Sequence, residues 1–181
     1  MPDEMLPKLH TLRQNSETQE PPEYGLDGPL TVYEYNDRKY AVVGMRRGGR
    51  NYYTLDITNR NSPAFAWEII GGDGSFSSLA QTWSKPMLTK LRVGGTEQEA
   101  LIFAGGYNAS VQDVATGRLP DTLGTSVYIV SPSSGALLAS YSVSTNSVPA
   151  NLLPVDINAN GVTDRLYYAD VGGRILRIDI P

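Results

Sequence analysis

Short runs of strand-forming residues recur along this chain in groups, and this periodicity constrains the fold more than any other feature. The first group lies at 30–35, 40–45, 52–57 and 65–70, the second at 87–93, 100–105, 126–131 and 137–143, and the third at 151–155, 165–170 and 174–180. Glycine, asparagine, aspartate and serine separate the runs, as turns between antiparallel strands require. Four strands in every 40–50 residues, roughly, is typical of a β-propeller blade.

We therefore predict an all-β fold: a partial β-propeller of about three four-stranded antiparallel blades, at roughly 30–70, 85–143 and 151–181. An antiparallel sandwich is the alternative, because it also contains regularly spaced short strands. Propellers close with about four to eight blades. We therefore expect this chain to be a segment of a larger propeller, or its open strand edge to be covered by another element.

The first 29 residues differ from the rest and predict a short helix followed by a linker. Apolar residues follow a helical spacing that Pro7 interrupts: Met5, Leu6, Leu9 and Leu12. The polar and proline-containing segment 14–23 is typical of a linker. The expected division is thus residues 1–29 for helix and linker and residues 30–181 for the propeller segment.

Composition excludes several classes of function. The net charge of −4 and the pI near 5.0 argue against a nucleic-acid partner. No apolar run reaches the roughly 18 residues of a membrane span, and the lack of cysteine excludes disulfides and thiolate metal sites. His10 is the chain's one histidine, and no nucleophile elbow is visible, so we expect no enzyme activity.

Residues 156–164 (Asp-Ile-Asn-Ala-Asn-Gly-Val-Thr-Asp) predict a calcium loop. Oxygen-bearing side chains stand at positions 1, 3, 5 and 9 and a glycine at position 6, which suits a hard cation that takes oxygen ligands. The expected ligands are the side chains of Asp156, Asn158, Asn160 and Asp164 and the backbone carbonyl of Val162. An Asx-rich turn without metal is the alternative. Extended flanking segments and Tyr167 at position 12 exclude a helix–loop–helix EF-hand.

Three further features allow two interpretations each. The long polar loop 107–124, with Asp113 and Asp121, is either a partner-binding surface or plain disorder. The tryptophans Trp67 and Trp83 are expected to pack between blades rather than to form a ligand platform. The segment 46–50 (Arg-Arg-Gly-Gly-Arg) is expected to be a hairpin turn with solvated arginines rather than an RNA-binding element.

Four segments, at 46–59, 81–86, 102–107 and 166–179, resemble characteristic segments of the PilY-type adhesins, large proteins of type IV pilus biogenesis found at the pilus tip. Residues 5–9 and 24–28 resemble that family's entry into its propeller. The resemblance implies a modified propeller and one EF-hand-like calcium loop, onto which Asp156, Asn158, Asn160, Val162 and Asp164 fall. The chain departs from the family in length, and Asn160 stands where such loops often carry an acid.

The resemblance also implies a biological setting. It implies roles in pilus assembly, in calcium-regulated pilus extension and retraction, and in surface adhesion. The implied partners are minor pilins or other tip components and a host or abiotic surface. The implied location is the cell surface at the pilus tip, or the outer membrane and periplasm, of a Gram-negative bacterium. Two alternatives are a quinoprotein-like dehydrogenase, with a quinone and calcium, and an integrin-type propeller, which would repeat its calcium loop in every blade.

Overall fold

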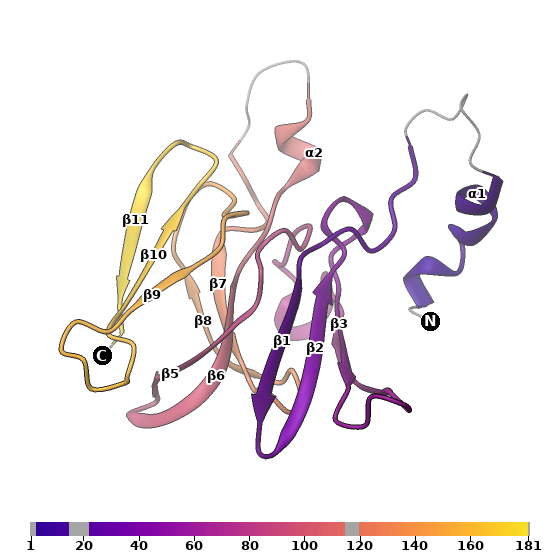
Figure 1. Cartoon of the computed structure of the whole chain (residues 1–181). Helices are drawn as coiled ribbons and strands as arrows, with labels where there is room; N and C mark the ends of the chain where they lie inside the picture. The colour runs from indigo at the N-terminus through magenta and orange to yellow at the C-terminus, as the bar shows by residue number, and fades with distance from the viewer. Residues whose placement is uncertain (1–2, 15–21, 115–119, 181) are drawn as a thin grey trace.

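The structure, a computed structural model, describes residues 3–14, 22–114 and 120–180. Within these residues the chain forms three antiparallel sheets, and Figure 1 shows them side by side in chain order. Part of the expected linker (15–21) and part of the long loop (115–119) lie outside the described residues.

Each sheet is a simple meander in which neighbouring strands in the chain pair with one another. Blade 1 contains β1 (Leu30–Tyr35), β2 (Arg38–Gly44), β3 (Tyr52–Asp56) and β4 (Ala64–Ile69). Blade 2 contains β5 (Met87–Val93), β6 (Thr96–Ala104), β7 (Ser126–Val130) and β8 (Leu137–Ser142). Blade 3 contains β9 (Leu153–Val155), β10 (Arg165–Ala169) and β11 (Ile175–Asp179). The predicted all-β fold of three blade-like antiparallel sheets is confirmed.

Short helices lie outside the sheets. The expected N-terminal helix is α1 (Leu9–Gln14), which begins after Pro7 and follows a 3-10 turn, η1 (Asp3–Met5). Two more 3-10 turns, η2 (Arg46–Gly48) and η3 (Gly74–Phe76), and one turn of α-helix, α2 (Ala109–Gln112), interrupt the connections. None of the helices in the described part of the chain is long and apolar enough to cross a bilayer.

β6 is the strand that extends furthest beyond the sequence pattern. β6 begins at Thr96 rather than at residue 100, because β5 and β6 are joined by a two-residue turn and pair from Val93 and Thr96 onward. The turn residues Gly94 and Gly95 both have positive φ, 60° and 82°, as a tight hairpin of this kind requires. The added residues of β6 project from the core and are polar, so they gave no strand signal in the sequence.

Blade 2 is buried on both faces, which explains the continuous apolar runs in its central strands. Side chains alternate across a strand. On β6, Leu101 and Phe103 pack toward blade 1, whereas Ala100, Ile102 and Ala104 pack toward blade 3. β7 divides its residues in the same way between the two sides. The molecule therefore has two inter-blade cores that share the same two strands.

The two cores differ in chemistry. The aromatic interface, between blades 1 and 2, contains Tyr33, Tyr40, Val42, Tyr52, Trp67, Ile69, Leu79, Leu101, Phe103, Tyr128 and Val130. The aliphatic interface, between blades 2 and 3, contains Leu91, Ala100, Ile102, Ala104, Val127, Ile129, Val148, Leu152, Leu166, Tyr168 and Ile180. Burial of this apolar surface is the main term that holds the blades face to face.

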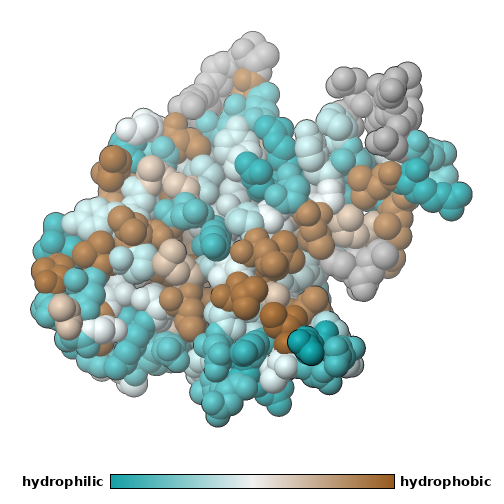
Figure 2. All heavy atoms as spheres, in the orientation of Figure 1, coloured by the Kyte–Doolittle hydropathy of each residue, from teal (hydrophilic) through white to brown (hydrophobic). Residues whose placement is uncertain are grey.

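The outer face of blade 1 stays at the surface although it is also apolar. Val32, Ala41, Leu55 and Phe65 lie opposite one another across the four strands. Val32 and Phe65 are 59% and 62% exposed. Figure 2 shows apolar side chains gathered on the near side of the molecule, over β1. Blade 1 is thus covered on one face only, in contrast with blade 2.

Candidate metal centre

The predicted calcium loop, residues 156–164, connects β9 to β10 and is fixed at its base. The backbone N–H of Thr163 donates to the carbonyl of Lys90 on β5 at 2.7 Å, and the Thr163 and Thr89 hydroxyls lie 2.7 Å apart. Val162 is only 4% exposed. The tip of the loop is exposed, and Figure 1 shows it at one end of blade 3. A rigid base with a solvent-accessible tip suits a site that exchanges an ion with water.

The side-chain oxygens of the first three expected ligands turn toward the backbone of the loop. Asp156 accepts from Asn160 N at 3.3 Å and from Gly161 N at 2.7 Å. Asn158 accepts from Asn160 N at 3.1 Å, and Asn160 accepts from Val162 N at 2.8 Å. Successive Asx turns therefore curl the loop and keep these oxygens on its inner side.

Asp164, the fourth expected side-chain ligand, closes the loop from its other end. Its Oδ2 accepts from Ile157 N, the residue after Asp156, at 2.8 Å. Its backbone is fixed on both sides, because its N–H donates to Val155 O at 3.0 Å and its carbonyl accepts from Ile180 N at 2.8 Å. Within the described residues, no arginine or lysine forms an ion pair with Asp156 or Asp164. Two carboxylates thus share one loop without a countercharge.

The loop's backbone is tightly wound. Ala159 has φ 58° and Gly161 has φ 83°, so two residues out of three adopt the left-handed conformation. A Cβ added at Gly161 would meet no other atom, so only the positive φ of the backbone would disfavour a side chain at this position. An alanine in this conformation costs roughly 1 kcal/mol or more, which is strain held within the loop.

The oxygens present fit a calcium ion chemically. A carboxylate has about four lone-pair positions, and the backbone N–H donors take two of those on Asp156. Within the described residues, no N–H donates to the Val162 carbonyl, which leaves that oxygen available. No group of three or more histidine, cysteine, aspartate or glutamate side chains occurs in that same part of the chain. A metal here would therefore depend on amide and carbonyl oxygens as well as on two carboxylates, and its assignment stays a prediction.

The two aspartates predicted to contact a partner lie in different environments. Asp113 follows α2 and is exposed, and its Oδ1 accepts from Tyr107 OH at 2.6 Å. Asp121 is 8% exposed and accepts from Gln112 Nε2 at 2.9 Å and from Ser147 N at 2.8 Å. Asp121 therefore fastens the long loop to the segment before β9, and its burial argues against direct contact with a partner. For the exposed Asp113, contact with a partner stays a prediction.

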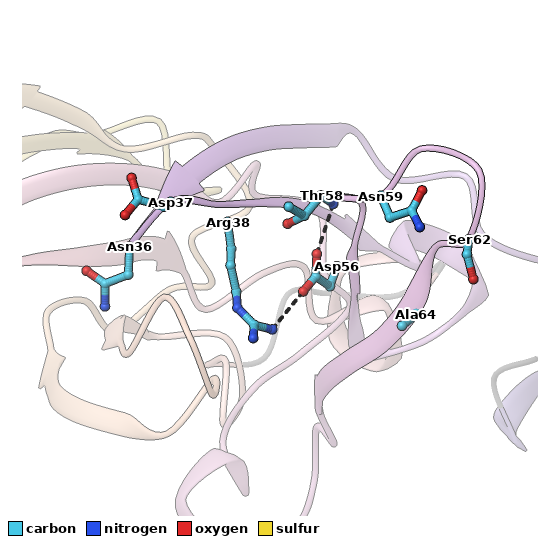
Figure 3. A pocket seen from close by; sticks show the side chains of 8 residues that line it. All are labelled: Asn36, Asp37, Arg38, Asp56, Thr58, Asn59, Ser62 and Ala64. Carbon is cyan, nitrogen blue, oxygen red and sulfur yellow. Dashed lines mark hydrogen bonds and ion pairs between the residues drawn. The ribbon is translucent and has the colours of Figure 1, made fainter.

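Apart from the loop, a hollow lies at the tips of the blade 1 hairpins (Figure 3). It has a volume of about 460 Å³, and the residues that line it are polar except for Ala64: Asn36, Asp37, Arg38, Asp56, Thr58, Asn59, Ser62 and Ala64. Hydrogen bonds from Thr58 and the ion pair with Arg38, at 3.0 Å, hold the pKa of Asp56 below its ordinary value. That carboxylate is thus engaged in stabilising the turn, and the hollow offers no nucleophile with an adjacent base.

The two tryptophans also differ. Trp67 is 6% exposed in the aromatic interface and donates from Nε1 to Pro132 O at 3.1 Å, so the prediction of inter-blade packing is confirmed for it. Trp83 is only half-buried and belongs to neither interface. Its ring lies beneath the guanidinium of Arg46, 4.5 Å from the ring centroid. Trp83 thus packs outside both hydrophobic cores, between Arg46 of the β2–β3 connection and Tyr107 of the β6–β7 connection, so its contacts are only partly those of an inter-blade core residue.

Comparisons with known proteins support the resemblance seen in the sequence. No family model matches the chain. A type IV pilus biogenesis factor PilY1 homolog of Xylella fastidiosa is 25% identical over 167 residues, which cover 86% of this chain and 12% of the relative. The type IV pilus biogenesis factor PilY1 of Pseudomonas aeruginosa strain UCBPP-PA14 is 27% identical over 145 residues, covering 77% of this chain and 11% of the relative. The chain thus spans a small part of the length of the relatives it matches.

A solved structure agrees in fold. The crystal structure of the Pseudomonas aeruginosa PilY1 C-terminal domain superposes with a TM-score of 0.63 at 21% identity, over 84% of this chain and 29% of that chain. At this identity the likeness shows a shared propeller-like fold. The matches in sequence support a relationship, at modest identity, to the PilY-type family of type IV pilus biogenesis factors.

Proposed function

We propose that this chain is a non-catalytic, calcium-binding propeller segment of a type IV pilus biogenesis factor. The observation that supports calcium most directly is the curled loop 156–164, where Asp156 and Asp164 lie without an ion-pair partner among the described residues. A divalent cation would supply the countercharge that the protein does not.

Calcium would act on this chain by ordering the loop. Asp156 and Asn158 would orient the first half of the loop, and Asp164 would join the second half to β9 and to Ile180 through the bonds it already makes. A bound ligand stabilises the folded state by mass action, by about 2.7 kcal/mol at a hundredfold excess over its dissociation constant. With two charged ligands, affinity in the range of extracellular modules, roughly 10⁻⁴ to 10⁻³ M, is expected.

The proposed wider role rests on the resemblance seen in the sequence, and the relatives' names support its pilus biogenesis part. We infer that the longer protein acts in pilus assembly, in calcium-regulated extension and retraction and in surface adhesion, at the pilus tip or in the outer envelope. Its partners would be minor pilins or other tip components. A calcium-dependent change in order at the exposed loop would give such partners two different surfaces to meet.

Calcium titration tests the metal. Thermal unfolding of the purified chain should shift to higher temperature with added calcium, and Asp156→Ala and Asp164→Ala should each abolish that shift. Asp37→Asn is the matched control, since it removes an exposed carboxylate from a blade 1 turn that lies outside the loop and should keep the full shift. An unchanged shift in Asp156→Ala would overturn the site.

The pilus role needs a separate test. The full-length gene carrying Asp156→Ala should fail to restore calcium-dependent twitching motility in a deletion strain of the parent organism, whereas Asp37→Asn should restore it. Loss of motility in the deletion strain with full rescue by Asp156→Ala would retain the pilus role and reject the calcium regulation.

A further inference from the structure

A group of aromatic and basic side chains outside the calcium loop forms a second candidate site, at the η2 turn of blade 1. The guanidinium of Arg46 lies 4.5 Å from the centroid of the Trp83 ring, and that of Arg47 lies 5.7 Å from the same centroid. Arg47 is also 5.7 Å from the ring centroid of Tyr24. Tyr107 packs against Trp83 with ring centroids 5.0 Å apart. We call Arg46, Arg47 and Trp83 the arginine platform.

The two arginines of the platform have no anionic partner. Within the described residues, neither guanidinium donates a hydrogen bond or forms an ion pair, and both side chains are exposed. Arg50, four residues on from Arg46, behaves differently, because it donates to the carbonyls of Leu79 and Ser77. Two unpaired cations on one indole create a local positive potential on a chain whose net charge is −4.

The backbone holds Arg46 in a conformation that a long side chain rarely adopts. Its φ is 53°, in the left-handed region. Hydrogen bonds on both sides enforce it: Gly48 N donates to Met45 O at 2.9 Å, and Met45 N donates to Thr82 Oγ1 at 2.7 Å. Strained residues of this kind cluster at binding and active sites. The turn thus fixes the backbone from which Arg46 projects, and the proposal rests on the charge of the platform and on the hollow beside it.

A hollow lies beside the platform. Its volume is about 340 Å³ and its lining contains Asp27, Gly28, Pro29, Arg46, Trp83 and Asn151. The Asn151 oxygen already accepts from Lys85 N at 2.7 Å, which leaves the amide nitrogen as a donor. The hollow thus combines a guanidinium and an amide donor with Asp27, a carboxylate that can accept from an N–H group.

We propose that the arginine platform and this hollow bind a carboxylate-bearing peptide segment of a partner protein. A guanidinium matches a carboxylate with two parallel hydrogen bonds, and Arg46 and Arg47 provide two such forks. Asp27 would accept a backbone N–H of the same peptide. A nucleic acid or polyphosphate fits less well, because its phosphate backbone has no N–H group to donate to Asp27. The site is built mainly around the η2 turn of blade 1, with Asn151 contributed by the segment that leads into blade 3, and it shares no residue with loop 156–164.

Peptide titration tests the proposal. The probes are acetylated, amidated tetraglutamate, tetraglutamine and tetralysine peptides, with binding followed by isothermal calorimetry at low and at physiological salt. Tetraglutamate should bind and weaken with salt, and the other two should not. The double variant Arg46→Gln/Arg47→Gln should weaken it by about tenfold or more, a loss of about 1.4 kcal/mol or more. No binding of tetraglutamate at millimolar concentration, or tighter binding of single-stranded DNA or polyphosphate through the same arginines, would overturn it.

Two further variants separate binding from folding. Arg60→Gln removes one arginine from the exposed β3–β4 turn and should leave the tetraglutamate affinity unchanged within about twofold. Arg46→Gly relieves the positive φ, so it should unfold at the same or a higher temperature while losing affinity. If Arg46→Gly instead lowered the unfolding temperature and kept the affinity, Arg46 would have a structural role only, and the proposal would fail.

Discussion

The two inter-blade interfaces are built from the same strands of blade 2 but hold their partners by different means. In the aromatic interface, Tyr52 and Phe103 have ring centroids 4.7 Å apart and Phe103 and Tyr128 5.5 Å apart. The hydroxyls of the buried tyrosines find backbone partners: Tyr33 donates to Pro132 O and Tyr52 to Ser84 O, each at 2.6 Å. Large rings thus supply contact area and hydrogen bonds together.

The aliphatic interface has smaller side chains and relies on a polar clasp beside it. Asp170, at the β10–β11 turn, has a side chain that is 0% exposed and accepts from Arg174 Nη2 at 2.6 Å and Ser144 Oγ at 2.8 Å. The same carboxylate accepts from the backbone N–H of Gly172 at 2.9 Å and so shapes the turn. One carboxylate therefore ties blade 3 to the segment that leaves blade 2. The aromatic interface should therefore weaken in alkali, where tyrosines ionise, and the aliphatic interface should weaken in acid, where Asp170 is protonated.

The largest expected effect comes from truncating each core in turn. Phe103→Ala and Ile102→Ala change adjacent residues of β6 that face opposite interfaces and are 1% and 0% exposed. Each should lower the free energy of unfolding, by about 3–5 kcal/mol for the phenylalanine and about 2–5 kcal/mol for the isoleucine. Chemical denaturation measures these losses.

Hydrogen exchange then shows which blade opens. Phe103→Ala should raise exchange in blade 1 first, and Ile102→Ala should raise it in blade 3 first. Equal exchange across all three blades in both variants would show a single cooperative core and remove the distinction between the interfaces.

Removing the buried carboxylate should come next in size. Asp170→Asn keeps the shape but leaves Arg174, which is 45% exposed, without its anion, and it should destabilise the chain by about 1–3 kcal/mol. Burial works to raise the pKa of Asp170, but hydrogen bonds from Arg174, Ser144 and Asn146 outweigh it and hold the pKa well below its ordinary value. The wild-type stability that Asp170 supplies is therefore present above pH 4, approximately, and lost as the pH falls further.

The acid limb measures this dependence. Urea unfolding between neutral pH and pH 2, approximately, should give a smaller slope against pH for Asp170→Asn than for the wild type. Asp179→Asn is the matched control, because Asp179 pairs with Arg165 and Arg177 on an exposed strand edge. Equal slopes in wild type and Asp170→Asn would show that the clasp does not set the acid stability.

The aromatic interface should show the opposite dependence. Burial raises the pKa values of Tyr52 and Tyr33 well above that of a free tyrosine. Their contribution to stability is thus complete below pH 10, approximately, and is lost as the pH rises beyond it. Tyr52→Phe should cost about 1 kcal/mol at neutral pH, since Ser84 O loses its donor, yet it should flatten the alkaline limb. An alkaline limb as steep as that of the wild type would assign the loss to other groups.

What could be predicted from the sequence was local. The strands follow from period-two alternation and from turn residues such as Asn36 and Asp37, whose φ values of 51° and 60° suit a tight hairpin. The order of the expected ligands in loop 156–164 was visible for the same reason, because these residues are contiguous in the sequence. The Asx turns at Asp156 and Asn158 fit both interpretations of the loop, a calcium site and an Asx-rich turn without metal, and the metal stays a prediction.

What could not be predicted depends on contacts between distant segments. The clasp at Asp170 needs Ser144 and Asn146, and the burial of Asp121 needs Ser147, none of which the sequence places nearby. In the sequence, an aspartate within a polar segment looks the same whether its side chain is exposed to solvent or buried against a turn. The left-handed Arg46 was hidden likewise, since the hydroxyl that fixes its turn comes from Thr82.

The smallest predicted difference compares one hydroxyl on each interface. Thr31 Oγ1 donates to the buried Pro86 carbonyl at 2.8 Å, and Thr163 Oγ1 lies 2.7 Å from the half-buried Thr89 hydroxyl. Thr31→Val should cost about 1–2 kcal/mol, because a buried acceptor is left unpaired, and Thr163→Val should cost less than about 1 kcal/mol, because water can replace the lost partner. Paired denaturant melts measure the difference. A larger loss of stability in Thr163→Val than in Thr31→Val would contradict this order. It would mean that the base of loop 156–164 helps to hold blade 3 against blade 2, a role that the Asp170 clasp would then share.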